Sequence, residues 1–90
     1  MPESAGRFLY RDDVLEQLLR HGVRPTDRTR PNLVRGFVRD LYKYEIRALR
    51  ERYLRREFPK HEYADRVDAL RRRYPVLALQ PRDLLYNPNS

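Results

Sequence analysis

The chain has 90 residues, of which 40% are hydrophobic and 37% are charged, so it can form one domain with a small core and a heavily charged surface. It contains no cysteine, which excludes disulfide bonds, thiol catalysis and zinc bound by cysteine. Its twenty Lys and Arg residues, against thirteen Asp and Glu residues, give a net charge of +7, which favours a polyanionic partner or an acidic protein surface.

The composition favours helices over sheets. Val, Ile and Thr are too few for a β-sandwich, whereas the aromatic residues and leucines supply enough apolar area for a core. We expect an all-α fold, a three-helix bundle with a long central helix and an extended apolar C-terminal tail. The single basic domain would span residues 1–90, with a mobile N-terminus at 1–6 and the tail at 75–90.

Two further properties concern location. No run approaches the roughly 18 apolar residues that a membrane span requires. The N-terminal sequence also lacks the charged and then apolar order of a secretory signal. A cytoplasmic protein without a membrane span is therefore expected.

The first predicted helix runs from about Asp13 to His21. Asp13 followed by Glu16 fits a capping box at its start, with Asp12 as an alternative cap. Gly22 stands where a left-handed residue closes a helix, which predicts a Schellman ending.

The second predicted helix, from Pro31 to Phe58, is the longest element, with Thr29 as its expected N-cap. Its apolar residues fall on two strips that are rotated by roughly a quarter turn, so we expect one partner helix to cover the first strip and another to cover the second. Gly36 costs this helix about 1 kcal/mol relative to alanine, and either a close approach of another backbone or simple tolerance would explain it. The first strip contains Leu33, Val34, Phe37, Val38, Leu41, Tyr44 and Ala48, and the second contains Tyr42, Ile46, Leu49 and Tyr53.

A row of cations lies opposite the apolar strips of this helix. Steps of mostly four residues place these cations about 6 Å apart, and like charges at this spacing weaken an isolated helix. The row is therefore a candidate polyanion-binding surface, with a solvated helix face as the alternative. The basic loop before the helix could extend it at one end. The row contains Arg35, Arg39, Lys43, Arg47 and Arg50, and the loop contributes Arg24, Arg28 and Arg30.

The third predicted helix runs from about Lys60 to Tyr74. Tyr63, Val67 and Leu70 form with Tyr74 a narrow strip at spacings of four, three and four, which is typical of packing against another helix. The short connection predicts that this helix lies antiparallel to the second helix, on the second apolar strip.

The tail after Tyr74 is interrupted by Pro75 and Pro81, so it is not expected to begin as a helix. It either wraps back over the helices or provides a docking segment for another chain, and the first alternative is favoured because monomers avoid exposed apolar runs. The candidate protein-interaction residues of the tail are Leu77, Leu79, Leu84, Leu85 and Tyr86.

The sequence shows no pattern of catalytic residues. His21 and His61 stand in no spacing typical of a triad or a metal site, and Ser4 and Ser90 are both terminal. We therefore expect no enzyme activity, no catalytic residue, no metal, no cofactor and no small-molecule substrate.

Two functions remain. The first is a small basic helical protein that binds RNA, DNA or a ribonucleoprotein through phosphate contacts, although no recognised nucleic-acid-binding module is present. The alternative is a protein-interaction or assembly subunit, either a homo-oligomer or an adaptor to an acidic protein. A helix lying on an anionic membrane is less favoured because no lipidation signal accompanies it.

Overall fold

The computed structural model describes residues 7–87; the expected mobile segment at 1–6 and the end of the tail at 88–90 lie outside the described residues. Within residues 7–87 the chain forms three α-helices, two short 3₁₀ turns and no strand, apart from one isolated antiparallel bridge between Tyr10 and Leu85. The all-α prediction is confirmed. The elements are α1 (Asp12–Arg20), α2 (Pro31–Leu54), α3 (Lys60–Arg72), η2 (Pro75–Ala78) and η3 (Pro81–Leu84).

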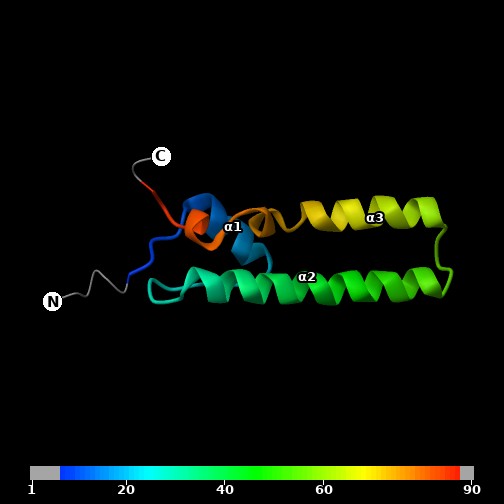
Figure 1. The fold of residues 1–90 in the computed structure, drawn as a ribbon, viewed down its shortest axis with the longest axis horizontal. Coiled ribbons are helices and arrows are strands. Elements are labelled where there is room, and N and C mark those ends of the chain that lie inside the picture. Colours follow the sequence, from blue (N-terminus) through cyan, green and yellow to red (C-terminus); the bar gives the residue numbers. More distant parts are fainter. Residues whose placement is uncertain (1–6, 88–90) are drawn as a thin grey trace.

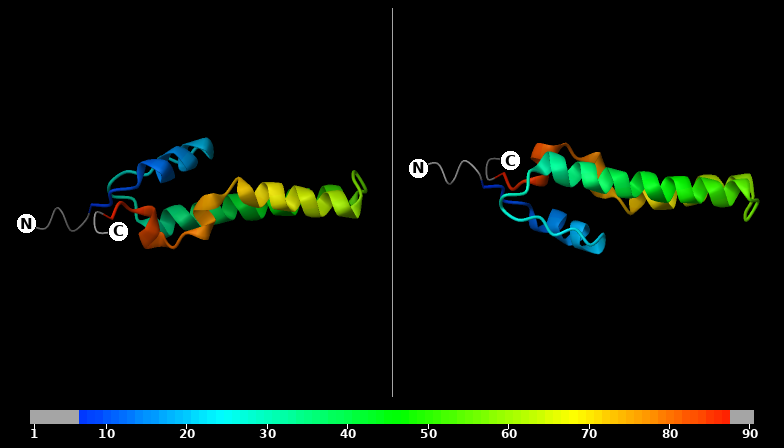
Figure 2. Two further views of the ribbon diagram at one scale, coloured as in Figure 1. Left: turned by 90° about the horizontal axis from the view of Figure 1, so that it is seen from above. Right: turned by 90° about the horizontal axis from the view of Figure 1, so that it is seen from below.

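The long helix α2 and the antiparallel helix α3 form a hairpin, and α1 lies near the end of the hairpin opposite its turn (Figure 1). Seen from above and below, α1 stands to one side of the hairpin rather than along it (Figure 2). The molecule is accordingly elongated, with extents of 59 × 22 × 17 Å. The N-terminal half of α2 is covered mainly by the tail turns η2 and η3, where the sequence predicted another helix.

The first helix begins one residue before the predicted start and without the predicted capping box. Arg11 occupies the N-cap position, and no side chain caps the helix. The Asp13 carboxylate instead accepts hydrogen bonds from Arg11, from Nε at 3.0 Å and from Nη2 at 2.6 Å. These hydrogen bonds lower the pKa of Asp13. The guanidinium next to it thus competes successfully with the helix N–H groups for this carboxylate.

The end of α1 follows the prediction. Gly22 has φ of 75°, and the N–H of Val23 donates to the carbonyl of Leu18 at 2.9 Å. A second bond joins the Gly22 N–H to the Leu19 carbonyl, also at 2.9 Å. These two bonds define a Schellman ending, which glycine permits because a left-handed residue strains any side chain.

The start of α2 at Pro31 is confirmed, but Thr29 does not cap it. Arg30 is the N-cap residue and makes no side-chain cap, while the Thr29 hydroxyl accepts a hydrogen bond from the Thr26 N–H at 2.9 Å. Pro31 lacks an N–H group, so one of the donors left open at a helix start is absent. The threonine thus shapes the loop rather than the helix.

The end of α2 comes four residues before the predicted end, at Leu54. The chain leaves the helix through Arg56, whose φ is 62°, and the N–H of Glu57 returns to the Arg52 carbonyl at 3.2 Å. This early turn brings Phe58 into the core, 7% exposed, against Tyr53 and Tyr63. The expectation that the helix continues to the residue before Pro59 does not predict this early end, because burial of Phe58 requires the chain to turn before the proline.

The packing of α3 on the second strip of α2 is confirmed. Tyr53 and Tyr63 stack with ring centroids 4.6 Å apart, and Tyr42 meets the edge of Tyr74 at 5.4 Å. Leu49 is buried in the same core. The helix itself ends at Arg72, before the predicted Tyr74, and Pro75 then starts η2.

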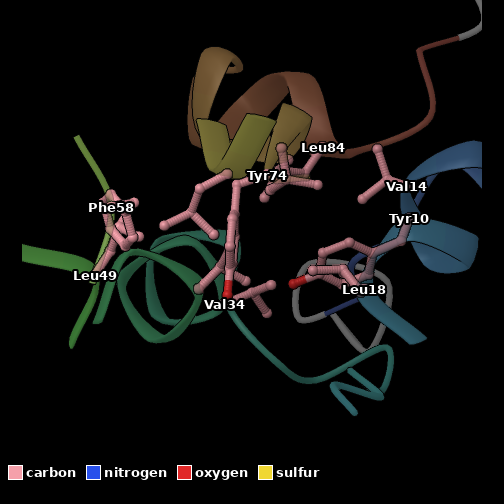
Figure 3. Close-up of a cluster of buried hydrophobic side chains, with 11 residues drawn as sticks. Tyr10, Val14, Leu18, Val34, Leu49, Phe58, Tyr74 and Leu84 are labelled. Carbon is pink, nitrogen blue, oxygen red and sulfur yellow. The ribbon is translucent and has the colours of Figure 1, made fainter. Parts of the chain in front are cut away.

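The core at the α1 end joins α1 to the tail. Val14 and Leu18 of α1, Val76 of η2 and Leu84 of η3 are each at most 1% exposed. In Figure 3 Leu84 lies between Tyr74 and the α1 side chains of Val14 and Leu18. Leu49 and Phe58, from the other end of the cluster, lie apart from them. The prediction that the tail wraps back over the helices is confirmed.

Candidate functional site

Four of the five cations predicted to form the row on α2 are exposed. Arg39, Lys43, Arg47 and Arg50 all lie on the outer surface of the helix. None of them forms an ion pair or a side-chain hydrogen bond with another residue in the described range 7–87. Asp40 lies beside the row and is exposed as well. These four side chains therefore retain their hydrogen-bond donors for an outside partner, and we refer to them as the basic row.

Arg35, the fifth predicted member, has a different environment. Its Nε donates to the Leu79 carbonyl at 2.7 Å and its Nη2 donates to the Leu77 carbonyl at 2.8 Å. Both bonds cross more than forty residues of sequence and are partly buried. Arg35 thus holds the tail against α2, and its guanidinium is already engaged within the chain.

The basic loop before α2 has an ordered shape. Thr26 and Thr29 bond to one another across it, and the Phe8 N–H donates to the Asp27 carbonyl at 2.7 Å. Asp27 also lies 3.7 Å from Arg7 in an exposed ion pair. The predicted site residues of the loop, Arg24, Arg28 and Arg30, are exposed and form no ion pair among residues 7–87.

Other cations of the hairpin are paired, in contrast to the basic row. Arg66 binds Glu62 at 2.6 Å, and Arg52 binds Glu57 at 2.9 Å. The hydrogen bonds that Glu57 accepts from Arg52 and Arg55 lower its pKa. The remaining pairs are Arg71 and Arg72 with Asp68, and Arg73 with Glu45. Within residues 7–87, positive charge on α3 and at the C-terminal end of α2 is thus partly neutralised by ion pairs, whereas charge along the basic row is not.

Part of the predicted first apolar strip is exposed rather than buried. Val34 and Val38 are at most 3% exposed, but Leu33 is 68% exposed and Phe37 is 54% exposed. Tyr44, further along the same line, is 71% exposed. Adjacent helix residues point about 100° apart, so a tail covering the two valines leaves these larger side chains at the surface. The sequence prediction placed them in the core and was wrong.

The five predicted interaction residues of the tail divide by exposure. Leu84 is fully buried in the core of this chain, and Leu77, Leu79 and Leu85 are partly buried and packed against that core. Tyr86 alone among the five is exposed, at 62%. Most of the apolar surface of the tail is therefore used inside the molecule.

The two histidines lie far apart in sequence and in different environments. His21 stacks on Tyr74 with ring centroids 4.3 Å apart, and its Nε2 lies 2.9 Å from the Arg73 carbonyl oxygen. His61 is exposed in the first turn of α3. Among residues 7–87, no three His, Asp or Glu side chains gather closely enough to hold a metal ion. Within the same range, no helix has the length and apolar character needed to cross a membrane.

Comparison with known proteins gives no relationship from which a function could be transferred. No family model, no curated protein and no solved structure matches this chain.

Proposed function

We propose that this protein binds a polyanion, either RNA or DNA or the nucleic acid of a ribonucleoprotein, through the basic row of α2. The observation that carries the proposal is the exposure of four cations along one side of a helix with no acidic partner among residues 7–87. A net charge of +7 supports the same class of partner. The proposed activity is binding, without catalysis or a cofactor.

The spacing of the basic row suits phosphate contacts. Arg39 and Arg50 are separated by eleven residues, which corresponds to about 16 Å along a helix axis. Guanidinium groups bind phosphate oxygens with two hydrogen bonds, and such contacts give affinity without reading the base sequence. We therefore expect binding that is tight at low salt, weak at high salt and largely independent of nucleotide sequence.

The other predicted cations have two different roles in this proposal. Arg24, Arg28 and Arg30 precede α2 and extend the positive surface at its N-terminal end. Arg35 contributes indirectly, because it keeps the tail docked on α2 through the Leu77 and Leu79 carbonyls. Arg35 is accordingly left unchanged in the test below.

The test is charge reversal of three members of the basic row, Arg39→Glu, Lys43→Glu and Arg47→Glu, in one variant. Binding to a mixed RNA and duplex-DNA pool is measured by fluorescence anisotropy at several salt concentrations. We expect at least about tenfold weaker binding at ~50 mM salt. The slope of log affinity against log salt should also fall by about 2 to 3, because three phosphate contacts are lost.

A matched control reverses three exposed cations outside the row: Lys60→Glu, Arg71→Glu and Arg82→Glu. Both variants have the same net charge, so a difference in binding reports position and not total charge. Equal losses in the two variants would contradict the proposal, as would a wild-type protein that binds neither pool at low salt. Unfolding of the row variant, seen by circular dichroism, would show that the row is structural and would also contradict it.

The alternative function, a protein-interaction or assembly subunit, is supported by the exposed apolar side chains of α2. Leu33, Phe37 and Tyr44 are each more than half exposed. The tail residues proposed for this role from the sequence are mostly packed on their own chain, so a protein partner would use α2 instead.

A further inference from the structure

Four apolar residues form one line on α2, and we call them the apolar strip: Leu33, Phe37, Tyr44 and Ala48. Their spacings of four, seven and four keep them within about 60° on a helical wheel. The strip lies between the buried side of α2, marked by Val34, and the basic row. Exposed aromatic side chains in such a line are typical of a surface that another protein covers.

A hollow lies at each end of the apolar strip. The first hollow, about 220 Å³, is formed by Leu33, Val34 and Phe37 together with the loop residues Val23 and Pro25. The side chains around it are largely apolar, and Val34 forms part of its buried floor. This hollow is large enough to accept one apolar side chain of a partner.

The second hollow, about 400 Å³, lies between α2 and α3. Tyr44, Ala48 and Leu49 line it from α2, and Ala69 and Leu70 line it from α3. The small alanines on the two helices leave room for a partner side chain at this position. From Leu33 to Tyr44 the strip advances eleven residues, so the two hollows are about 16 Å apart along the helix axis.

We infer that the apolar strip binds an amphipathic helix of an acidic partner protein. Two apolar side chains of the partner, about eleven residues apart, would occupy the two hollows. This is the geometry of a helix lying in a groove, in which anchors repeat at whole turns along one side. The apolar contacts of this inference are made by residues other than the basic row, and the inference goes beyond the proposed binding of nucleic acid.

The charges around the apolar strip select an acidic partner. Arg24, which forms no ion pair within residues 7–87, borders the first hollow. Arg52, Arg66 and Arg73 border the second hollow, where each is paired with one carboxylate of this chain. The one acidic residue lining the second hollow, Glu45, accepts hydrogen bonds from Tyr74 and Arg73. The basic row adds positive charge along one side of the strip that no carboxylate of residues 7–87 pairs with. Acidic residues beside the partner's apolar anchors would therefore meet positive charge along the length of the strip.

A second copy of this chain fits the strip less well. Each copy carries a net charge of +7, and the basic row lies beside the strip, so a symmetric dimer through this surface would bring two basic rows together. The acidic helix is the occupant that satisfies both the apolar and the charged parts of the surface.

The experiment uses a designed peptide as the probe. The peptide is a roughly 18-residue helix with two leucines eleven positions apart, alanine and leucine between them on the same side, and glutamate on the other sides. A control peptide replaces every glutamate with lysine and keeps the apolar residues. Binding to the full chain is measured by fluorescence anisotropy, and we expect the glutamate peptide to bind at least about tenfold more tightly than the lysine peptide.

Neutral substitutions on the protein locate the site. Phe37→Ser and Tyr44→Ser should each weaken binding of the glutamate peptide by at least about tenfold, because aromatic anchors carry much of the affinity of such interfaces. Leu54→Ser is the matched control, since Leu54 is 63% exposed on α2 but lies off the strip. All three positions are exposed, so the fold should persist, and circular dichroism checks this.

Three results would overturn the inference: equal binding of the two peptides, equal effects of the strip and control substitutions, or a wild-type dimer that Phe37→Ser converts to a monomer. The last result, from light scattering, would identify a second copy as the occupant. Nucleic-acid binding by the same variants separates the two proposals. Loss of peptide binding with nucleic-acid binding retained supports a distinct apolar site, and absence of nucleic-acid binding in the wild type leaves the peptide result standing alone.

Discussion

At the α1 end of the molecule four segments meet, whereas at the turn between α2 and α3 only two helices meet. The α1 end is packed with aliphatic side chains from α1, η2, η3 and the first half of α2, including Val14, Val38 and Leu84 at 0% exposure. The turn end is held by aromatic rings, with Arg66 over the Phe58 ring at 4.4 Å and ion pairs around it. Phe58 at 7% and Leu49 at 9% are more exposed than these three aliphatic side chains.

The difference shows what a tail can do for a helical hairpin. Two helices bury only the surfaces that face each other, so other sides of α2 stay open to solvent. At the α1 end the tail adds a further layer, and Arg35 secures it through main-chain carbonyls. We therefore expect most of the stability to come from the α1 end and expect the exposed sides of the hairpin to be available for binding.

The largest expected effect is at Leu84, which is fully buried in the layer that the tail adds. Leu84→Ala should lower the free energy of unfolding by about 3 kcal/mol, because burial is lost and a cavity is left between α1, α2 and the tail. Leu49→Ala, at 9% exposure in the C-terminal part of α2 on the side of the turn, should cost about 2 kcal/mol. Urea unfolding followed by circular dichroism measures both values.

The order of these two costs tests the comparison directly. A larger cost for Leu49→Ala would mean that the hairpin, and not the tail layer, dominates the stability. If the two substitutions cost the same and the helix α1 is unchanged in Leu84→Ala, then α1 folds independently of the tail.

The sequence predicted the part of the fold in which one local pattern determines a contact. The four–three–four spacing from Tyr63 to Tyr74 implies a narrow strip that must meet another helix, and the second strip of α2 was the available partner. Gly22 predicted a helix end because few residues adopt its φ of 75°. In both cases the necessary information lies within about three helical turns.

The sequence could not predict contacts that depend on distant segments. Arg35 resembles the rest of its row in spacing, and only the folded tail, 42 and 44 residues away, distinguishes it. Likewise the helical wheel groups Phe37 with Val38, and only the position of η2 and η3 decides that one is exposed and the other buried. For the candidate site, the sequence identified the cations of the basic row, but the apolar strip requires the structure.

The second prediction concerns Tyr74, which joins the end of α1 to the middle of α2. Its ring stacks on His21, the C-cap residue of α1, and its hydroxyl donates a hydrogen bond to Glu45 of α2. Burial, together with this hydrogen bond to Glu45, raises the pKa of Tyr74 to about 12. Tyr74→Phe removes the hydrogen bond and should lower the free energy of unfolding by about 1.5 kcal/mol near neutral pH.

The pH dependence gives a sharper test of the same contact. Since the pKa of Tyr74 is about 12 in the folded protein and its ordinary value is 10.0, the hydroxyl contributes its full stability below pH 10 and loses it as the pH rises towards 12. Unfolding free energies between pH 10 and 12 should fall more steeply for the wild type than for Tyr74→Phe. Some decline persists in the variant, because burial also raises the pKa of Tyr10. Parallel curves would show that Tyr74 is not the group that titrates.

The smallest expected effect is at Gly36, on the side of α2 that neither α3 nor the tail covers. A Cβ added there would meet no atom within 4 Å. Gly36→Ala should therefore raise the free energy of unfolding by about 1 kcal/mol, since alanine has the higher helix propensity. Gly22→Ala, at φ of 75°, is the matched control and should lower the same free energy by about 1 kcal/mol. A loss of stability at both positions would mean that another part of the chain approaches α2 at Gly36, so this side of the helix would not be free for a partner.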